Sequence, residues 1–323
     1  MLELKKDEWR SEIILGNMMA FIKELKTILA DSQIMLDEPM KNHTTFKIGG
    51  PADCLVFPSS IEEITAVCAL IHSYDLPFTI LGNGSNVLVL DGGIRGVVVK
   101  FDNNLAYCRR DGNNVIAGAG SLLKDVSNYA AKCGLTGMEF AVGIPGSIGG
   151  AVFMNAGAYD GEISNIVEAV TAVSMSGKVI RYSAEKLNFS YRNSIFQENQ
   201  QVICEVELAL TEGVQHEIKG RMGDLTMRRE SKQPLEMPSA GSTFKRPEGY
   251  FAGTLIEETG LKGFRVGGAQ VSEKHAGFVV NAGKATADDV LNLIKEVQRM
   301  VYEKHGVKLH PEVRMIGERK LIK

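Results

Sequence analysis

Residues 143–158 read Gly-Ile-Pro-Gly-Ser-Ile-Gly-Gly-Ala-Val-Phe-Met-Asn-Ala-Gly-Ala. Four glycines and one proline among the first eight residues predict a loop rather than the interior of a helix. Small residues let the backbone lie close to a large flat ligand, and Ser147 and Asn155 can donate hydrogen bonds to it. Apolar residues flank the stretch on both sides, which favours a buried binding loop over a glycine-rich surface loop.

A second glycine loop lies earlier in the chain, at residues 82–86, where Gly-Asn-Gly-Ser-Asn separates two apolar segments. Its glycines allow positive φ angles, so backbone N–H groups can converge on phosphate oxygens. The same residues would also suit a plain hairpin turn. The loop is not a dinucleotide-binding fingerprint, because Val87 stands where the third glycine belongs and a strand is expected to follow.

The rest of the chain alternates between strand-like and helix-like segments, which predicts an α+β fold. Strands are expected at residues 54–57, 78–81, 87–90, 97–99, 115–119, 167–175, 178–182, 202–210 and 277–281. Helices are expected at residues 18–30, from 61, at 121–133, 217–230 and 252–259, and from 287. A capping box at Ser60 and Glu63 begins one helix, and Thr286 and Gly306 bracket the last.

The predicted organisation has four parts. They are an N-terminal tail and helix (1–30), a first lobe (31–100), a second lobe (101–215) and a third domain (216–323).

Composition and charge narrow the class of protein. The 323 residues carry a net charge of −3, which gives no basic footprint for nucleic acid, so we expect no nucleic-acid partner. Charged residues interrupt the stretch 13–30, so it cannot span a membrane. The five cysteines have no zinc or redox spacing, which predicts reduced thiols in a cytoplasmic protein and no metal site. They are Cys54, Cys68, Cys108, Cys133 and Cys204.

Both glycine loops also resemble those of a known family. The stretch 44–52, Thr-Thr-Phe-Lys-Ile-Gly-Gly-Pro-Ala, and residues 80–90 and 143–157 occur in the order of the FAD-binding stretches of UDP-N-acetylenolpyruvoylglucosamine reductases. These enzymes belong to the wider flavoprotein family of vanillyl-alcohol oxidase, and the resemblance runs from about residue 35 to the C-terminus. It implies a two-lobed FAD-binding domain of the vanillyl-alcohol-oxidase type and a C-terminal α+β substrate domain.

The resemblance also implies ligands and a reaction. FAD would be held non-covalently, NADPH would be the co-substrate, and UDP-N-acetylglucosamine enolpyruvate would be reduced to UDP-N-acetylmuramate for peptidoglycan synthesis. The residues assigned to FAD are Ile48, Gly82, Asn83, Gly84, Ser85, Asn86, Gly118, Gly143, Ile144, Ser147, Gly149, Gly150, Asn155 and Gly157.

Three further motifs, at residues 190–196, 240–245 and 311–314, resemble the active-site signatures of the family and assign its chemistry to Arg192, Ser242 and Glu312. Adding hydride to an enol ether conjugated to a carboxylate builds negative charge on that carboxylate. A fixed cation or a neutral acid must stabilise this charge, and a hydroxyl can then protonate the α-carbon. Each residue alone could instead be structural: the arginine in a surface loop, the serine capping a turn, and the glutamate ending a strand.

The UDP-sugar is expected to meet residues with charged or aromatic side chains. Lys232 resembles the substrate lysine of the family, and we add Arg246, Tyr191 and Tyr250 as substrate contacts. Only 49 residues (193–241) lie between the arginine and serine motifs, which fits the shorter subtype that lacks a tyrosine flap.

Two other interpretations remain open. A flavin oxidase of the wider family often tethers FAD through histidine or cysteine in the first glycine loop, and residues 82–86 contain neither. A flavin-binding module without turnover would need no proton donor.

Overall fold

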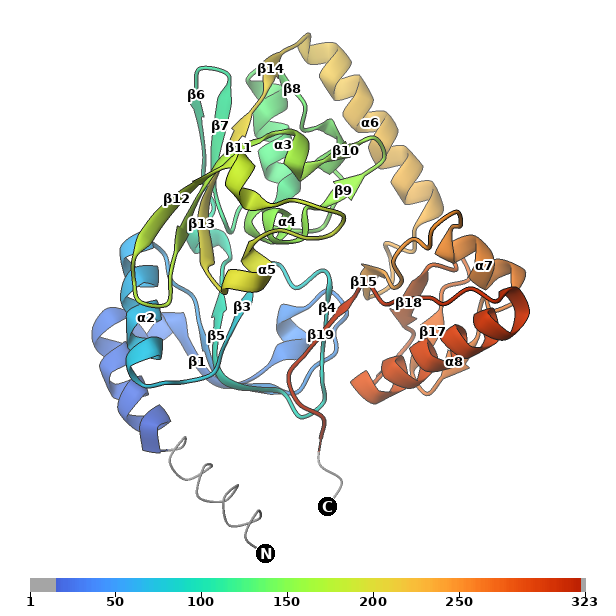
Figure 1. Ribbon diagram of the computed structural model, residues 1–323, viewed down its shortest axis with the longest axis horizontal. Helices are drawn as coiled ribbons and strands as arrows, with labels where there is room; N and C mark the ends of the chain where they lie inside the picture. Colours follow the sequence, from blue (N-terminus) through green and yellow to red (C-terminus); the bar gives the residue numbers. More distant parts are fainter. Residues whose placement is uncertain (1–15, 321–323) are drawn as a thin grey trace, which may run out of the picture. The chain divides into compact units, whose positions relative to one another are not determined.

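A computed structural model describes residues 16–320 of the chain (Figure 1). The chain folds into two compact units and passes between them several times. The first unit comprises the chain up to Leu36, Asp53–Gly82 and Gly96–Met222, and the second comprises Asp37–Ala52, Asn83–Arg95 and the chain from Gly223. The first glycine loop is therefore divided, because Gly82 belongs to the first unit and the rest of the loop to the second. Of the predicted N-terminal tail and helix (1–30), residues 1–15 lie outside the described residues.

A four-stranded sheet, most of whose residues belong to the first unit, has the order β1 (Ile34–Pro39), β2 (Pro51–Val56), β5 (Ile94–Lys100), β3 (Phe78–Leu81). Helix α2 (Ile61–Ser73) connects β2 to β3, which runs parallel to β5. The predicted capping box is half present: Ser60 Oγ accepts the Glu63 N–H, but the Glu63 carboxylate accepts from the N–H of Ser59. Residues 16–28 are helical, and Phe21 and Leu25 are buried in the same hydrophobic core as α2.

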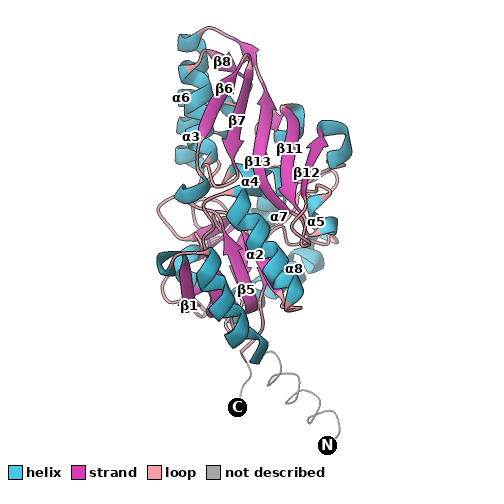
Figure 2. Cartoon of the chain, turned by 90° about the vertical axis from the view of Figure 1, so that its left-hand side faces the viewer, coloured by secondary structure: helices cyan, strands magenta, loops and turns pink. Residues whose placement is uncertain are grey.

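A five-stranded antiparallel sheet forms the second part of the first unit (Figure 2). Its order is β12 (Val179–Ser183), β11 (Val167–Val173), β13 (Val202–Ala209), β7 (Asn114–Gly118), β6 (Cys108–Asp111). Buried Val170 of β11 pairs with Val206 of β13, which in turn pairs with Ala117 of β7. Helices α3 (Leu123–Lys132) and α4 (Ile148–Met154) pack on each other, and α4 packs on β13 and β7.

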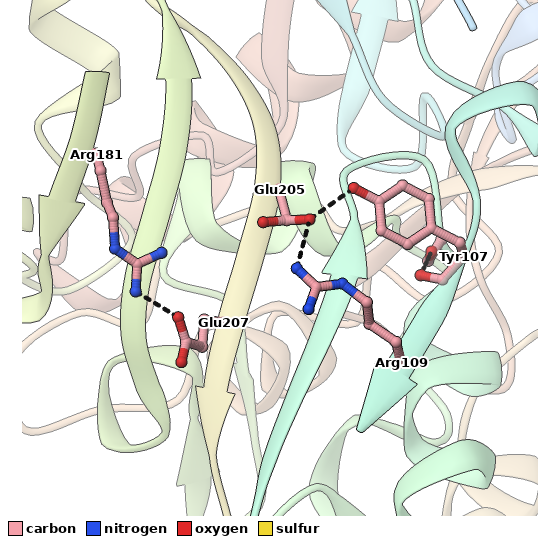
Figure 3. A network of polar contacts seen from close by, with 6 residues as sticks. Tyr107, Arg109, Arg181, Glu205 and Glu207 are labelled. Carbon is pink, nitrogen blue, oxygen red and sulfur yellow. Dashed lines mark hydrogen bonds and ion pairs between the residues drawn. The ribbon is translucent and has the colours of Figure 1, made fainter. Parts of the chain in front are cut away.

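The other face of this sheet carries a network of polar side chains (Figure 3). Glu205 accepts hydrogen bonds from the Tyr107 hydroxyl at 2.8 Å and from Arg109 at 3.4 Å. Glu207, two residues along β13, is paired with Arg181. The hydrogen bond from Arg181 holds the pKa of Glu207 below its ordinary value, because it stabilises the carboxylate. Glu205 and Glu207 are two residues apart on β13 and therefore lie on the same face of the sheet. Their cross-strand contacts make this the polar face.

The second unit contains an antiparallel sheet in the order β15 (Ser239–Ser242), β18 (Phe278–Asn281), β17 (Ala269–Val271), β16 (Arg265–Val266). It also contains the parallel pair β4 (Val87–Val89) and β19 (Arg314–Ile316), and the helices α7 (Ala252–Glu258) and α8 (Ala287–His305). Helix α6 (Gln215–Lys232) includes residues of both units.

Both ends of α8 have the predicted caps. Thr286 Oγ1 accepts the Asp289 N–H, and Gly306 follows the helix with φ 69°. The Asp91 carboxylate, just beyond β4, accepts the N–H groups of Ala287 and Asp288 at 2.9 and 3.0 Å. A carboxylate at this end of a helix is favoured by the free N–H groups and by the helix dipole, so the loop after β4 is tied to α8.

The predicted strands and helices are confirmed to within a few residues, with one error. Residues 148–154 form helix α4, although their glycines predicted a loop. Tertiary packing overrides propensity here: Ser147 caps the helix, Ile148 and Val152 are buried, and a Cβ at Gly149 would lie 2.9 Å from the Cβ of Ala119.

Sequence patterns missed several short elements. They are the strands β1, β6, β15, β16, β17 and β19, together with β8 (Leu135–Thr136), β9 (Gly157–Ala158), β10 (Gly161–Glu162), β14 (Thr211–Glu212) and α5 (Phe196–Asn199), and 3-10 helices at Asp31–Gln33, Met40–His43, Asn103–Leu105, Glu139–Ala141, Ile163–Asn165 and Ala184–Leu187. All five cysteines are free thiols. Among residues 16–320, no helix has the length and apolar character needed to cross a membrane.

Candidate active site

The second glycine stretch and Gly82 meet in the first unit. Ser147 Oγ accepts the Gly150 N–H at 3.5 Å, and a Cβ at Gly82 would lie 2.5 Å from the same oxygen. The N–H groups of Ile148 and Gly149 are already used, since they donate to Ser121 O and Ala119 O at 2.8 and 3.0 Å. Ser147 is 2% exposed, so the surface open to a ligand is a cradle formed by the half-buried backbone of Gly82 and Gly150. A Cβ at Gly82 would run into the Ser147 hydroxyl, whereas a Cβ at Gly150 would have room, so glycine is required at residue 82 and the backbone there can lie close to a phosphate-bearing group.

Other glycines of the FAD assignment have local packing reasons to be glycine. A Cβ at Gly118 would lie 2.7 Å from the Tyr107 ring and 2.4 Å from Leu105 O. A Cβ at Gly157 would lie 2.9 Å from Glu162 Cβ. Ile144 packs against the core of the first unit. These positions shape the fold around the glycine stretch, and their contact with FAD stays a prediction, as it does for Gly143.

The remainder of the first glycine loop lies in the second unit. Gly84 has φ 66°, and its carbonyl accepts the Thr45 N–H at 3.1 Å. A Cβ there would lie 2.3 Å from His43 O, so only glycine fits. This contact joins the loop to the stretch 44–52, in which Ile48 is buried in the hydrophobic core of the same unit. The side chains of Asn83 and Ser85 are half-buried.

Ser242 and Glu312 are brought onto neighbouring segments of the second unit. Residues 243–245 pair with residues 310–312, where Glu312 N–H donates to Thr243 O at 2.8 Å. Glu312 O accepts from Asn86 Nδ2 at 3.3 Å, and Asn86 O accepts the Arg314 N–H at 3.0 Å. The backbone of the glutamate is thus fixed between the strand of the serine and the first glycine loop.

Gly241 determines how Ser242 is presented. It has φ 75°, and the pairing of β15 with β18 shifts register between Ser239 and Ser242. A Cβ at Gly241 would meet nothing within 4 Å, so the backbone conformation, not space, requires glycine. Such a bulge re-aims the residue that follows it. Sequence reasoning missed this role, although a glycine directly before the serine was the available signal.

Arg192 belongs to the first unit and lies in a tight turn with positive φ. Its guanidinium donates to Gly157 O at 3.3 Å and lies over the ring of Tyr191, with 5.2 Å from Cζ to the ring centroid. Asn155, from the second glycine stretch, donates to Ser190 O at 3.1 Å. The arginine motif and the second glycine stretch are therefore one structural assembly.

The predicted substrate residues of the second unit are exposed. Lys232 ends α6, while Arg246 lies over the ring of Phe251, 4.0 Å from its centroid. Phe251 and Tyr250 are 60% and 49% exposed, which leaves aromatic surface beside a cation. Phe251 was missed by the sequence analysis, although it follows Tyr250 directly. This pair of charge and ring suits a ligand with both a phosphate and a flat base.

Comparisons with known proteins agree with these motifs. A model of the C-terminal domain of UDP-N-acetylenolpyruvoylglucosamine reductase matches residues 233–316, and a model of an FAD binding domain matches residues 52–183. UDP-N-acetylenolpyruvoylglucosamine reductase of Clostridium novyi is 56% identical over 296 residues, which cover 92% of this chain and 96% of the relative. The same enzyme of Clostridium perfringens is 53% identical over 299 residues, covering 93% and 98%.

A solved structure supports the same relationship. The crystal structure of UDP-N-acetylenolpyruvylglucosamine reductase from Thermus caldophilus superposes with a TM-score of 0.75 and 38% identity, covering 87% of this chain and 97% of that one. The expected α+β fold, with an FAD-binding part followed by a C-terminal domain, is thereby confirmed. The chain belongs to the UDP-N-acetylenolpyruvoylglucosamine reductase family.

Proposed function

We propose that this chain is an FAD-dependent reductase that uses NADPH to reduce UDP-N-acetylglucosamine enolpyruvate to UDP-N-acetylmuramate, for peptidoglycan synthesis. One observation carries the proposal. Asn86 of the first glycine loop holds the carbonyl of Glu312, whose N–H is bonded to the residue after Ser242. Hydrogen bonds thus join the segments that carry Asn86, assigned to the cofactor, and Ser242 and Glu312, assigned to the chemistry. We place the reaction in the cytoplasm, where free thiols are stable.

The cradle in the first unit supports the assignment of the FAD diphosphate to Gly82, Ser147 and Gly150. FAD, when bound, supplies hydride transfer. Neither glycine loop contains histidine or cysteine, so no covalent tether is available there and release should follow unfolding. We assign the loop residues Asn83, Ser85 and Asn86 to further cofactor contacts, as the sequence predicts.

Side chains of the protein would stabilise the negative charge that develops on the sugar substrate and would supply the proton. Hydride from NADPH reaches the β-carbon of the enolpyruvyl group, and negative charge develops on its carboxylate. We assign Arg192 to that carboxylate, where its guanidinium stabilises the charge, and keep Glu312 as the other residue assigned to the chemistry there. Ser242 gives its hydroxyl proton to the α-carbon and regains one from solvent. The sum is one hydride and one proton added across the double bond.

Substrate recognition is assigned to exposed residues. Lys232 and Arg246 would face the diphosphate, and Tyr191 and Tyr250 the sugar or base. In a chain of the shorter subtype, the exposed aromatic residues around Arg246 would stand in for the missing tyrosine flap.

Steady-state kinetics test the function. NADPH and the sugar would react with the same flavin ring of FAD in separate half-reactions. Each ligand must therefore leave before the other binds. We expect parallel lines when initial rates are plotted in double-reciprocal form against NADPH at several sugar concentrations. Intersecting lines would indicate a ternary complex and contradict the shared site, while turnover only with oxygen would favour the oxidase.

A further inference from the structure

The turn that carries Arg192 has a strained backbone. Ser190 N–H donates to Asn193 O at 3.2 Å and Asn193 N–H donates to Ser190 O at 3.1 Å, with Tyr191 and Arg192 at the corners. Arg192 has φ 56°, a region that glycine and asparagine adopt readily and a long side chain does not. Strain of this kind persists only where surrounding contacts enforce it, and it concentrates at functional sites.

Two amide side chains enforce the turn. Gln197 Nε2 donates to Arg192 O at 2.9 Å and to Phe153 O at 3.0 Å. Asn155 Nδ2 donates to Ser190 O at 3.1 Å, while its Oδ1 accepts the Ser164 N–H at 2.9 Å. Asn155 is 1% exposed. Each amide joins one carbonyl of the turn to the second glycine stretch or the segment that follows it.

The head of the arginine is held as well. Its guanidinium donates to Gly157 O at 3.3 Å and lies over the Tyr191 ring. The backbone and the guanidinium group of this arginine are both held in place. The side chain therefore loses little conformational entropy when it binds a carboxylate.

We propose that Gln197 and Asn155 are positioning residues for Arg192, which they hold in the strained turn so that its guanidinium is preorganised for the substrate carboxylate. Neither acts on the substrate itself. This inference rests on the proposed function, because the pose of Arg192 matters to turnover only if the enolpyruvyl carboxylate is its target.

Gln197→Met is the sharpest test, since methionine keeps the length and flexibility of glutamine and removes both donors. We expect the oxidation of NADPH-reduced enzyme by enolpyruvyl sugar to slow by about 10- to 100-fold, the scale of a displaced catalytic group. Flavin bleaching by NADPH and FAD content should stay at the level of the parent protein. Gln201→Met is the matched control: Gln201 lies four residues away, and its Oε1 accepts the Tyr182 hydroxyl at 2.7 Å. It should leave both half-reactions unchanged.

A double-mutant cycle separates positioning from general stability. If Gln197 acts through Arg192, Gln197→Met should have almost no further effect in an Arg192→Ala background. Equal slowing in both backgrounds, or equal slowing of both half-reactions, would overturn the inference. Should Gln197→Met fail to fold, Gln197→Leu is the second variant, because it also removes the hydrogen bonds to Arg192 O and Phe153 O; it should give the same selective loss. If the parent protein does not reduce the enolpyruvyl sugar, the proposed function itself fails.

Discussion

Gly150→Asp should purify as a folded but colourless protein, with FAD content lowered by more than about tenfold. The space is available, because the nearest atom to a Cβ at Gly150 would be Ser147 Oγ at 3.4 Å. The new carboxylate would lie three residues after the Ser147 cap, where an acidic residue completes a capping box and favours the helix. The same charge would repel a diphosphate in the cradle of Gly82 and Ser147. Absorbance of the flavin band, relative to protein, measures the loss.

Gly150→Asn is the control for this prediction, since asparagine has the size of aspartate without its charge. It should keep most of the FAD, and both variants should melt at or above the temperature of the FAD-free parent. A yellow Gly150→Asp protein with full FAD content would show that the diphosphate lies elsewhere. Gly149 is a poorer choice, because a Cβ there would lie 2.9 Å from Ala119 Cβ and the substitution would test packing instead.

Ser242→Ala should slow only one of the two half-reactions. Flavin bleaching by NADPH needs no proton from a serine hydroxyl, so its rate should stay close to that of the parent protein. Oxidation of the reduced enzyme by the enolpyruvyl sugar should slow by about 10²-fold or more, the scale of losing a positioned proton donor. Stopped-flow absorbance at the flavin band measures each half separately.

Ser239→Ala is the matched control, because Ser239 lies in the same strand, on the far side of the bulge at Gly241. It should change neither half-reaction. Equal slowing of both half-reactions by Ser242→Ala would make the serine structural, and no slowing of either would remove it from the chemistry.

Local sequence patterns predicted most of the helices and strands, because the residues that begin and end such elements act on their immediate neighbours. Thr286 and Gly306 bracket α8 as expected, since a cap and a positive-φ residue act within one turn. The error at α4 has the opposite cause. Glycines are poor helix formers, and only the tertiary contact with Ala119, which lies far away in sequence, reveals why glycine is needed at residue 149.

The sequence offered candidate site residues but not the contacts that hold them in place. The assignment of Arg192, Ser242 and Glu312 rests on motif resemblance and stays a prediction, whereas the FAD cofactor is confirmed by the match to an FAD binding domain. The residues that hold these groups were missed. Gln197 acts through hydrogen bonds to two carbonyls, and Gly241 acts through a bulge in a strand. The contacts of Gln197 leave no pattern in the sequence, and for Gly241 the one signal was a glycine directly before the serine.

Anaerobic reoxidation of the enzyme tests the central claim most directly. The yellow protein is first bleached with one equivalent of NADPH, and UDP-N-acetylglucosamine enolpyruvate is then added without oxygen. We predict that the flavin band returns in proportion to the sugar added, and that mass spectrometry finds a product heavier by two hydrogens. A flavin band that returns only when oxygen is admitted, or a protein that NADPH does not bleach at all, would contradict the assignment as a reductase of the enolpyruvyl sugar.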